Sequence, residues 1–277
     1  DQLDQGLLND FDNITLRNSV NTGLNYKKNT ITVNLSNSFS FESLERKYNN
    51  LNQKLTRDQV SIAPSLSVNY QITKSKSMYL SYSGRTTQPD LSQLEPLKQN
   101  DNPLVNYLDN KDLESGFTNN MYLYFNSYKQ LKDVSVYFGA NVSQYLNPVG
   151  STVTFDPESG RRDIQFVNID ESNISASAYG GYRRPLWKKI ALSMNIGGNV
   201  SYNNSYNYLS LANRESQLNN NENYSLSPSL GFSSYKANKW SFHLNMNPGY
   251  RINKSTLQPD LNTNNFILNS YVDLSYT

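Results

Sequence analysis

Residues 190–202 read IALSMNIGGNVSY, in which apolar side chains occupy every second position apart from one break at Gly198. The positions between them carry small or polar residues. Alternation with a period of two is typical of a β-strand whose two faces meet different surroundings. The fold therefore depends on which medium each of these two faces meets.

The same alternation recurs along the chain. It is clearest in residues 31–41, 61–72, 134–142, 190–202, 224–232, 240–252 and 266–276. Weaker strands are indicated at residues 14–26, 78–84, 119–128 and 174–183. The pattern predicts about eleven strands, and many of them reach the roughly 9–11 residues with which a tilted strand crosses a membrane.

The second face of these strands is mostly Ser, Asn, Thr or Gly. The outer face of a soluble sandwich would carry charged residues, which are the residue types most often exposed to water. A face of small uncharged residues is what we expect in a wide barrel interior, whether that interior is wet or filled by a plug. In lipid, helices and closed barrels are the structures that pair every backbone group, and no apolar run of helical membrane length occurs. The pattern predicts a barrel with its apolar face towards lipid.

Composition excludes several other classes. Only 36% of the 277 residues are hydrophobic, against roughly 45–50% counting glycine in a soluble domain, so we do not expect a deep two-sided core. The aromatic content of 12% argues against disorder. The net charge of +2 indicates no nucleic-acid partner. With no Cys and His243 as the single histidine, we expect no metal site and no cofactor.

Short cationic connections alternate with long polar ones. The short ones lie at residues 27–30, 74–77, 129–133, 183–189 and 236–239. The long ones lie at residues 43–58, 85–116, 150–171, 209–223 and 253–265. In the first long connection, Leu44, Tyr48, Leu51 and Leu55 have helical spacing, which predicts a loop with a short helix.

Short turns at one end and long loops at the other are the layout of an outer-membrane barrel. The predicted fold class is therefore all-β, an antiparallel transmembrane β-barrel portion of about eleven strands with short periplasmic turns and long extracellular loops. Aromatic residues near the strand ends fit two interfacial girdles. The predicted girdle near the short turns consists of Tyr182, Trp187, Tyr235 and Trp240.

Three prolines lie inside predicted strands, at Pro64, Pro228 and Pro248. Proline cannot donate a hydrogen bond to a strand ladder and is usually confined to edges or bulges. We therefore expect a local bulge or a strand end at each of these positions.

A longer motif lies within residues 78–125. Its residues are Arg85, Pro89, Leu94 and Pro96, followed by Asn110 and Leu113. The segment resembles the TonB-dependent-receptor-like outer-membrane β-barrel family, in which a strand leads into Arg, Pro and a Leu-x-Pro element. A Gly-Asn-Pro-x-Leu-x-Pro-Glu element follows in that family, and this chain departs from it at Asp109, Lys111, Ser115 and Gly116. The resemblance implies a structural element above the barrel rim, without a catalytic role.

The resemblance also implies a larger protein. Complete receptors of this family have an N-terminal plug domain and a barrel of about 22 strands. On that basis we expect residues 1–277 to form a partial barrel domain, the C-terminal half of a larger barrel, without the plug. The implied function is uptake of a scarce nutrient (a siderophore, glycan or peptide) across the outer membrane of a Gram-negative bacterium. The implied partners are outer-membrane lipid, the TonB complex acting through the plug, and a surface lipoprotein.

Two places carry candidate chemistry. Asp156, Glu158, Arg161 and Arg162 crowd one long loop, which is either a ligand-contact loop or a solvated hairpin tip. His243 is expected on the polar face, as a solvated residue or a ligand contact.

No hydrolase, phosphate-loop or zinc-protease motif is present, so we do not expect an enzyme. Three alternatives remain open. An outer-membrane barrel enzyme would need a Ser-His pairing through His243. A structural adhesin or a soluble carbohydrate-binding β-sandwich would need no catalytic group.

Overall fold

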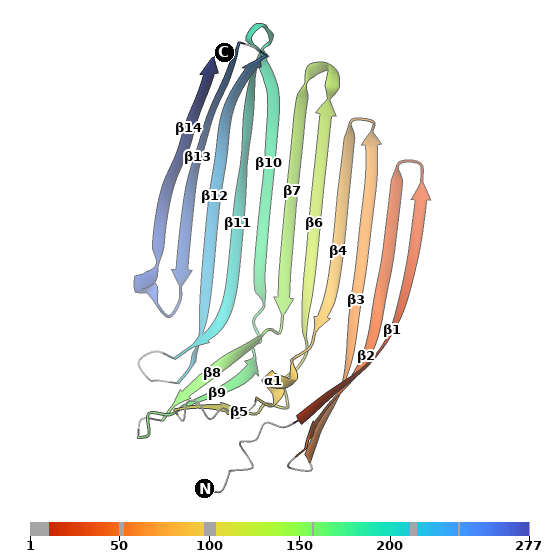
Figure 1. Ribbon diagram of the computed structural model, residues 1–277, viewed down its shortest axis with the longest axis vertical. Helices are drawn as coiled ribbons and strands as arrows, with labels where there is room; N and C mark the ends of the chain where they lie inside the picture. Colours follow the sequence, from red (N-terminus) through yellow and green to blue (C-terminus); the bar gives the residue numbers. More distant parts are fainter. Residues whose placement is uncertain are drawn as a thin grey trace.

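The computed structural model describes residues 11–49, 53–96, 104–156, 158–210, 215–237 and 239–276. Its main feature is an antiparallel sheet of 11 strands, which follow one another in chain order apart from the strands of a second, smaller sheet (Figure 1). The strands are β1 (Phe11–Lys28), β2 (Ile31–Tyr48), β3 (Gln53–Thr73), β4 (Lys76–Thr87), β6 (Gly116–Lys129), β7 (Val134–Leu146), β10 (Asn173–Trp187), β11 (Leu192–Leu209), β12 (Gln217–Lys236), β13 (Trp240–Ser255) and β14 (Thr263–Tyr276). The predicted fold class and its eleven strands are confirmed.

Two faces of different chemistry run across this sheet, because directly opposed residues of paired strands share a face. One row consists of Tyr26, Val33, Val68, Leu80, Leu123, Ala140, Ala178, Val200, Leu226, Tyr250 and Phe266. The next row consists of Asn25, Asn34, Ser67, Ser81, Tyr122, Asn141, Ser177, Ser201, Ser225, Arg251 and Asn265. The alternation predicted from single strands is therefore continuous over the whole sheet.

The apolar face is not covered by protein in the described part of the chain. Leu24 is 73% exposed and Leu226 is 52% exposed. Within the described residues, the fully buried large apolar side chains are Leu94, Leu113 and Ile169, and all three belong to the long connections. A sheet of this kind has no internal core, and its apolar face matches the outward-facing band of a membrane barrel.

The connections sort to opposite ends of the sheet, as predicted (Figure 1). The short turns at the upper end join β1 to β2, β3 to β4, β6 to β7, β10 to β11 and β12 to β13. The long connections at the lower end hold helix α1 (Leu91–Leu94) and a three-stranded sheet of β5 (Val105–Leu108), β9 (Arg162–Asn168) and β8 (Val149–Phe155). In the described residues, no helix is long and apolar enough to cross a bilayer.

The predicted loop with a short helix at residues 43–58 is wrong for the residues that the structure describes, and Leu51 lies outside them. Residues 43–48 continue β2 and residues 53–58 begin β3, with Leu44 paired to Arg57 across the hairpin. Strand β3 has 21 residues, which is about twice the length that a membrane crossing needs. Beyond the lipid both faces of a strand meet water, so the apolar alternation that reveals a strand in sequence disappears there.

The strand prolines are accommodated in two ways. At Pro64 the ladder to β4 ends, because that pairing begins at Ser65. Between β12 and β13, pairing stops at Leu226 and resumes in unchanged register at Leu230. Pro228 and Pro248 thus occupy opposed positions and share one gap in hydrogen bonding. Pro64 itself lies inside β3 and keeps its register with β2, so the expected bulge or strand end is wrong for all three prolines.

Asn219 holds two of the long connections together. Its side chain is 1% exposed. Its Oδ1 accepts hydrogen bonds from Ser255 Oγ (2.9 Å), Thr256 Oγ1 (3.2 Å) and Leu257 N (2.9 Å), and its Nδ2 donates to Asn207 Oδ1 (3.3 Å). One amide on β12 thereby fixes the end of β13 and the start of the turn that follows.

Asn219→Leu is expected to destabilise this corner by about 1–3 kcal/mol, because it leaves buried donors without an acceptor. Faster hydrogen exchange at the Leu257 amide would report the loss. Asn223→Leu is the matched control, since Asn223 lies on the same strand with an exposed side chain. Equal exchange in the two variants would contradict the role given to Asn219.

Candidate functional site

A large hollow on the polar face lies at the end with the long connections. It is a groove of about 910 Å³ between strands β1 to β3 on one side and the end of β4 with the chain that follows it on the other. Arg17, Glu42 and Gln59 stand in one row across its floor. Arg17 Nη2 lies 2.9 Å from Glu42 Oε2. Residues 85–92 form the opposite wall.

This wall follows an edge of β3 that no strand covers. Beyond Ser65, β3 has no ladder to β4, and polar side chains of the wall take the place of a strand. The Ile62 amide donates to Thr86 Oγ1 at 3.0 Å, and Gln88 Nε2 donates to Val60 O at 2.8 Å. The wall is thus fixed to the strand beside the groove floor.

The predicted motif residues gather next to this wall, with one exception. Leu94 and Leu113 are each 1% exposed and, with Ile169, form the buried core of the long connections. Asn110 joins the two halves of the motif, because its amide donates to Leu94 O (3.0 Å) and its Nδ2 donates to Phe166 O (2.7 Å). Pro89 is buried and Pro96 is half-buried.

The exception is Arg85, which is exposed and lines the groove from β4. The structure therefore separates the motif into a packed cluster and a single cation at the groove.

Two anchoring residues of this cluster escape sequence reasoning. Arg57 on β3 donates to Lys111 O (3.3 Å) and Leu113 O (2.5 Å). Asn168 on β9 accepts from the Glu114 amide (2.8 Å) and donates to the Glu114 carbonyl (3.0 Å). Both contacts join segments far apart in sequence, so no local pattern could reveal them.

Arg46 is the third arginine at the groove, and its guanidinium is held by protein groups. It is 4% exposed, and its Nε donates to Asn13 Oδ1 (3.1 Å) while Nη1 donates to Glu95 O (3.0 Å). Its guanidinium carbon lies 4.6 Å from the ring centre of Phe11, a cation–π contact. Arg46 therefore ties β1, β2 and the end of the α1 segment together.

The predicted ligand-contact loop is the turn between β8 and β9. Ser159 Oγ donates to Asp156 Oδ2 at 2.5 Å, and this hydrogen bond holds the pKa of Asp156 below its ordinary value. Glu158, Arg161 and Arg162 are exposed, and none of the four predicted residues lines the groove. The geometry is that of a hydrogen-bonded turn tip, and a ligand role for it stays a prediction.

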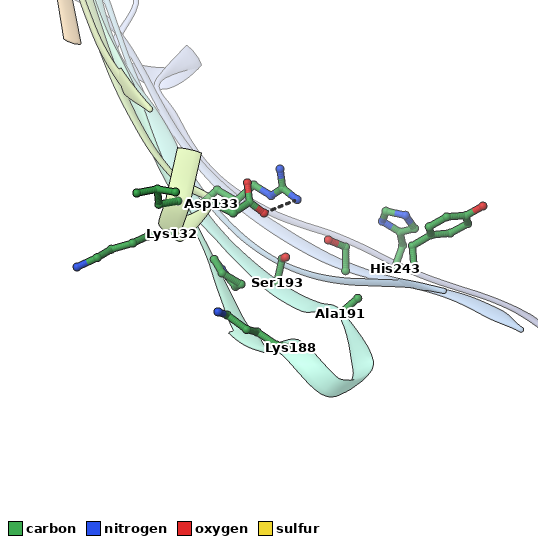
Figure 2. Close-up of a pocket in the computed structure, with 11 residues that line it drawn as sticks. Lys132, Asp133, Lys188, Ala191, Ser193 and His243 are labelled. Carbon is green, nitrogen blue, oxygen red and sulfur yellow. Dashed lines mark ion pairs between the residues drawn. The ribbon is translucent and has the colours of Figure 1, made fainter. Parts of the chain in front are cut away.

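A smaller pocket of about 530 Å³ lies at the end with the short turns. Figure 2 shows Asp133, Ser193 and His243 around it, and Asp133 Oδ2 lies 3.9 Å from Arg183 Nη2. His243 is on the polar face, as predicted, and is exposed.

The strand register places Ser233, His243 and Asp273 opposite one another on three neighbouring strands. A catalytic triad requires hydrogen bonds from serine to histidine and from histidine to the acid. Among the described residues, His243 is hydrogen-bonded neither to Ser233 nor to Asp273. Among the described residues, no group of three or more His, Cys, Asp or Glu could hold a metal ion.

Three of the four predicted girdle residues lie on the apolar face. Tyr182 is opposite Ile196, and Trp240 is opposite Tyr276. Trp187, 56% exposed, reaches this face because a register shift between Pro185 and Trp187 places it opposite Leu192. Bulges are known to redirect side chains in this way.

The girdle assignment of Tyr235 is wrong. Tyr235 is opposite Ser241, on the same face as His243, and lines the pocket at the short turns. The physical reason is parity along β12, where the apolar positions are even-numbered. Tyr235 has an odd number and no bulge shifts it, so its side chain faces the polar side.

The chain was compared with known proteins. It matches the model of the outer membrane protein β-barrel family over residues 13–275. The siderophore receptor PirA from Pseudomonas aeruginosa is similar with 12% identity and a TM-score of 0.41, over 96% of this chain and 57% of that one. The outer membrane transporter YddB from Escherichia coli is similar with 10% identity and a TM-score of 0.42, over 96% of this chain and 36% of that one. This chain thus spans little more than half of the first structure and about a third of the second. No curated protein matches it.

Proposed function

This chain belongs to the outer membrane protein β-barrel family, and on that premise we propose that it is the transport barrel of a TonB-dependent receptor-like protein. Its place is the outer membrane of a Gram-negative bacterium. The proposed activity is uptake of a scarce nutrient of the siderophore, glycan or peptide class. The nutrient binds at the long-connection end and passes along the polar face.

The observation that carries this proposal is the continuous polar face, which leads away from the groove through Ser, Asn and Tyr residues of all eleven strands. Such a face offers hydrogen-bonding groups with few fixed charges to a polar solute. Interiors of wide barrels are polar in the same way, whether open or plugged. A plain structural role would not require a polar path of this extent.

We propose that residues 1–277 contribute part of a larger barrel, as its C-terminal half. The order of the 11-stranded sheet begins at β1 and ends at β14. Within lipid, every backbone group needs a partner inside protein. Further strands of the same protein would supply those partners, and a plug domain outside this chain would close the lumen and connect it to the TonB complex. A surface lipoprotein above the long connections remains part of the proposal.

The alternatives have less support. A barrel enzyme would act through His243, and in the described part of the chain this histidine lacks the contacts of a catalytic triad. A soluble sandwich would cover its apolar face, whereas here Leu24 and Leu226 are exposed. An adhesin would not need the polar path.

The test compares three strains on limiting ferric chelates, oligosaccharides and short peptides: the wild type, a strain lacking this protein and a strain lacking TonB. We expect one nutrient to support growth of the wild type but of neither mutant strain. We also expect the His243→Ala protein to restore growth of the strain lacking this protein as well as the wild-type protein does. An intact protein without a plug domain and TonB box would contradict the proposal. So would identical growth of all three strains.

A further inference from the structure

We propose that the groove binds a carboxylate-bearing nutrient, with Arg85 pairing with the carboxylate and Gln59 donating a hydrogen bond to a neighbouring oxygen. This inference rests on the proposed uptake function and names the chemistry of its ligand. Four features of the groove support it: a buried amide and an arginine that have no partner among the described residues, the balance of charge, and the volume.

Gln59 is the buried group. It is 6% exposed, lines the groove, and its Nε2 has no hydrogen-bond partner among the described residues. Buried polar side-chain atoms nearly always have a partner, so one without a partner at a cavity wall calls for an explanation. An amide Nε2 can only donate, and its missing partner is therefore an acceptor oxygen.

Arg85 is the cation. It lines the same groove from β4 and is exposed. Within the described part of the chain, its guanidinium makes no ion pair and no hydrogen bond, whereas Arg17 pairs with Glu42 and Arg46 is held by Asn13 and Glu95. A guanidinium presents a planar fork of donors that matches a carboxylate with two parallel hydrogen bonds.

The balance of charge favours a single negative charge on the ligand. The lining contains three arginines (Arg17, Arg46 and Arg85) and two carboxylates (Glu42 and Asp90), which leaves one positive charge. A phosphate with two charges would meet Glu42 and Asp90 without a second free cation. One carboxylate satisfies Arg85 and leaves the Arg17–Glu42 pair intact.

The volume sets the size of the ligand. About 910 Å³ is at the upper end of the roughly 300–1,000 Å³ of small-molecule pockets. Ser38, Ser40 and Ser61 add hydroxyl groups around the floor. Two kinds of ligand would bring such a carboxylate into the groove: a glycan with a uronic acid, or a short peptide with its C-terminus.

The experiment measures binding by calorimetry to the intact protein purified in detergent. The probes are methyl galacturonide and N-acetyl-trialanine, which each carry one carboxylate and no other charge. Each is compared with its neutral counterpart, the methyl ester or the C-terminal amide. We expect one of the two acids to bind and its neutral counterpart to bind at least tenfold more weakly. The acid that binds identifies the source of the carboxylate. Binding of neither acid at millimolar concentration would overturn the proposal, as would equal binding of an acid and its neutral form.

Two variants assign the contacts. Arg85→Gln is expected to weaken binding about ten- to hundredfold, because a hydrogen bond to a charged group is lost. Gln59→Met is expected to weaken binding without lowering stability, because Nε2 loses no hydrogen bond to any residue that the structure describes. Arg251→Gln on β13 is the control, since it removes an arginine from the same face outside the groove. An unchanged affinity in Arg85→Gln, or an equal loss in Arg251→Gln, would contradict the assignment.

The outcome separates this inference from the uptake function. TonB-dependent uptake of a neutral nutrient would refute the carboxylate site and leave the transport function standing. Tight binding of an acid without TonB-dependent uptake would support the carboxylate site and refute the transport function.

Discussion

Leu80→Arg is expected to destabilise the folded barrel by about 2–4 kcal/mol, whereas Ser81→Arg is expected to leave its stability nearly unchanged. Leu80 is opposite Val68 and Leu123 on the apolar face. It lies four residues after Lys76 at the short turn, which is near the middle of a crossing of roughly 9–11 residues. An arginine there must enter lipid.

Ser81 is the matched control because it is the next residue of the same strand. It is opposite Ser67 and Tyr122 on the polar face, where an arginine meets a polar interior. The measurement is urea unfolding of the intact protein in lipid vesicles, with both variants compared to wild type. A larger loss in Ser81→Arg than in Leu80→Arg would reverse the assignment of the two faces.

Leu113→Ala is expected to destabilise the packed cluster of the long connections by about 2–5 kcal/mol, because it empties a fully buried site. Leu113 is 1% exposed, and its carbonyl accepts a hydrogen bond from Arg57. The membrane-crossing parts of the strands should keep their stability, since the cluster lies at the end of the sheet with the long connections, where Arg57 of β3 contacts it (Figure 1). The expected result is faster proteolysis of the long connections at an unchanged unfolding transition of the barrel.

Leu108→Ala is the control for this second prediction. Leu108 belongs to β5 in the same region and is 39% exposed, so its truncation leaves no cavity. If the long connections of Leu113→Ala were cleaved at the wild-type rate, the cluster would not be what holds them. Loss of the barrel transition would show that the cluster and the strands unfold together.

The sequence predicts the fold well where lipid dictates the residue pattern. From Ile31 to Phe41 the apolar face touches lipid, and alternation with one break at Asn37 identifies the strand. From Leu44 to Tyr48 the same strand lies beyond that zone, and helical spacing misled the prediction. Strands β5, β8 and β9 were missed for the same reason, since they pack on other connections and never face lipid.

The site was less predictable because it depends on register. Leu94, Leu113 and Asn110 were found through a motif, and they lie together. Gln59 carries no signal in sequence, since only the pairing of β1, β2 and β3 brings it beside Arg17 and Glu42. Parity alone would have placed Tyr235 on the polar face.

The central claim is that the chain crosses the outer membrane with its short turns inside and its long connections outside. It is tested most directly by labelling single cysteines on intact cells with a membrane-impermeant maleimide, since the chain has no native Cys. Glu158→Cys lies in the turn between β8 and β9, and Leu131→Cys lies at a fully exposed short turn. We expect Glu158→Cys to be labelled on intact cells and Leu131→Cys to be labelled only after the outer membrane is permeabilised. Labelling of Leu131→Cys alone on intact cells, or recovery of the protein in the soluble fraction, would contradict it.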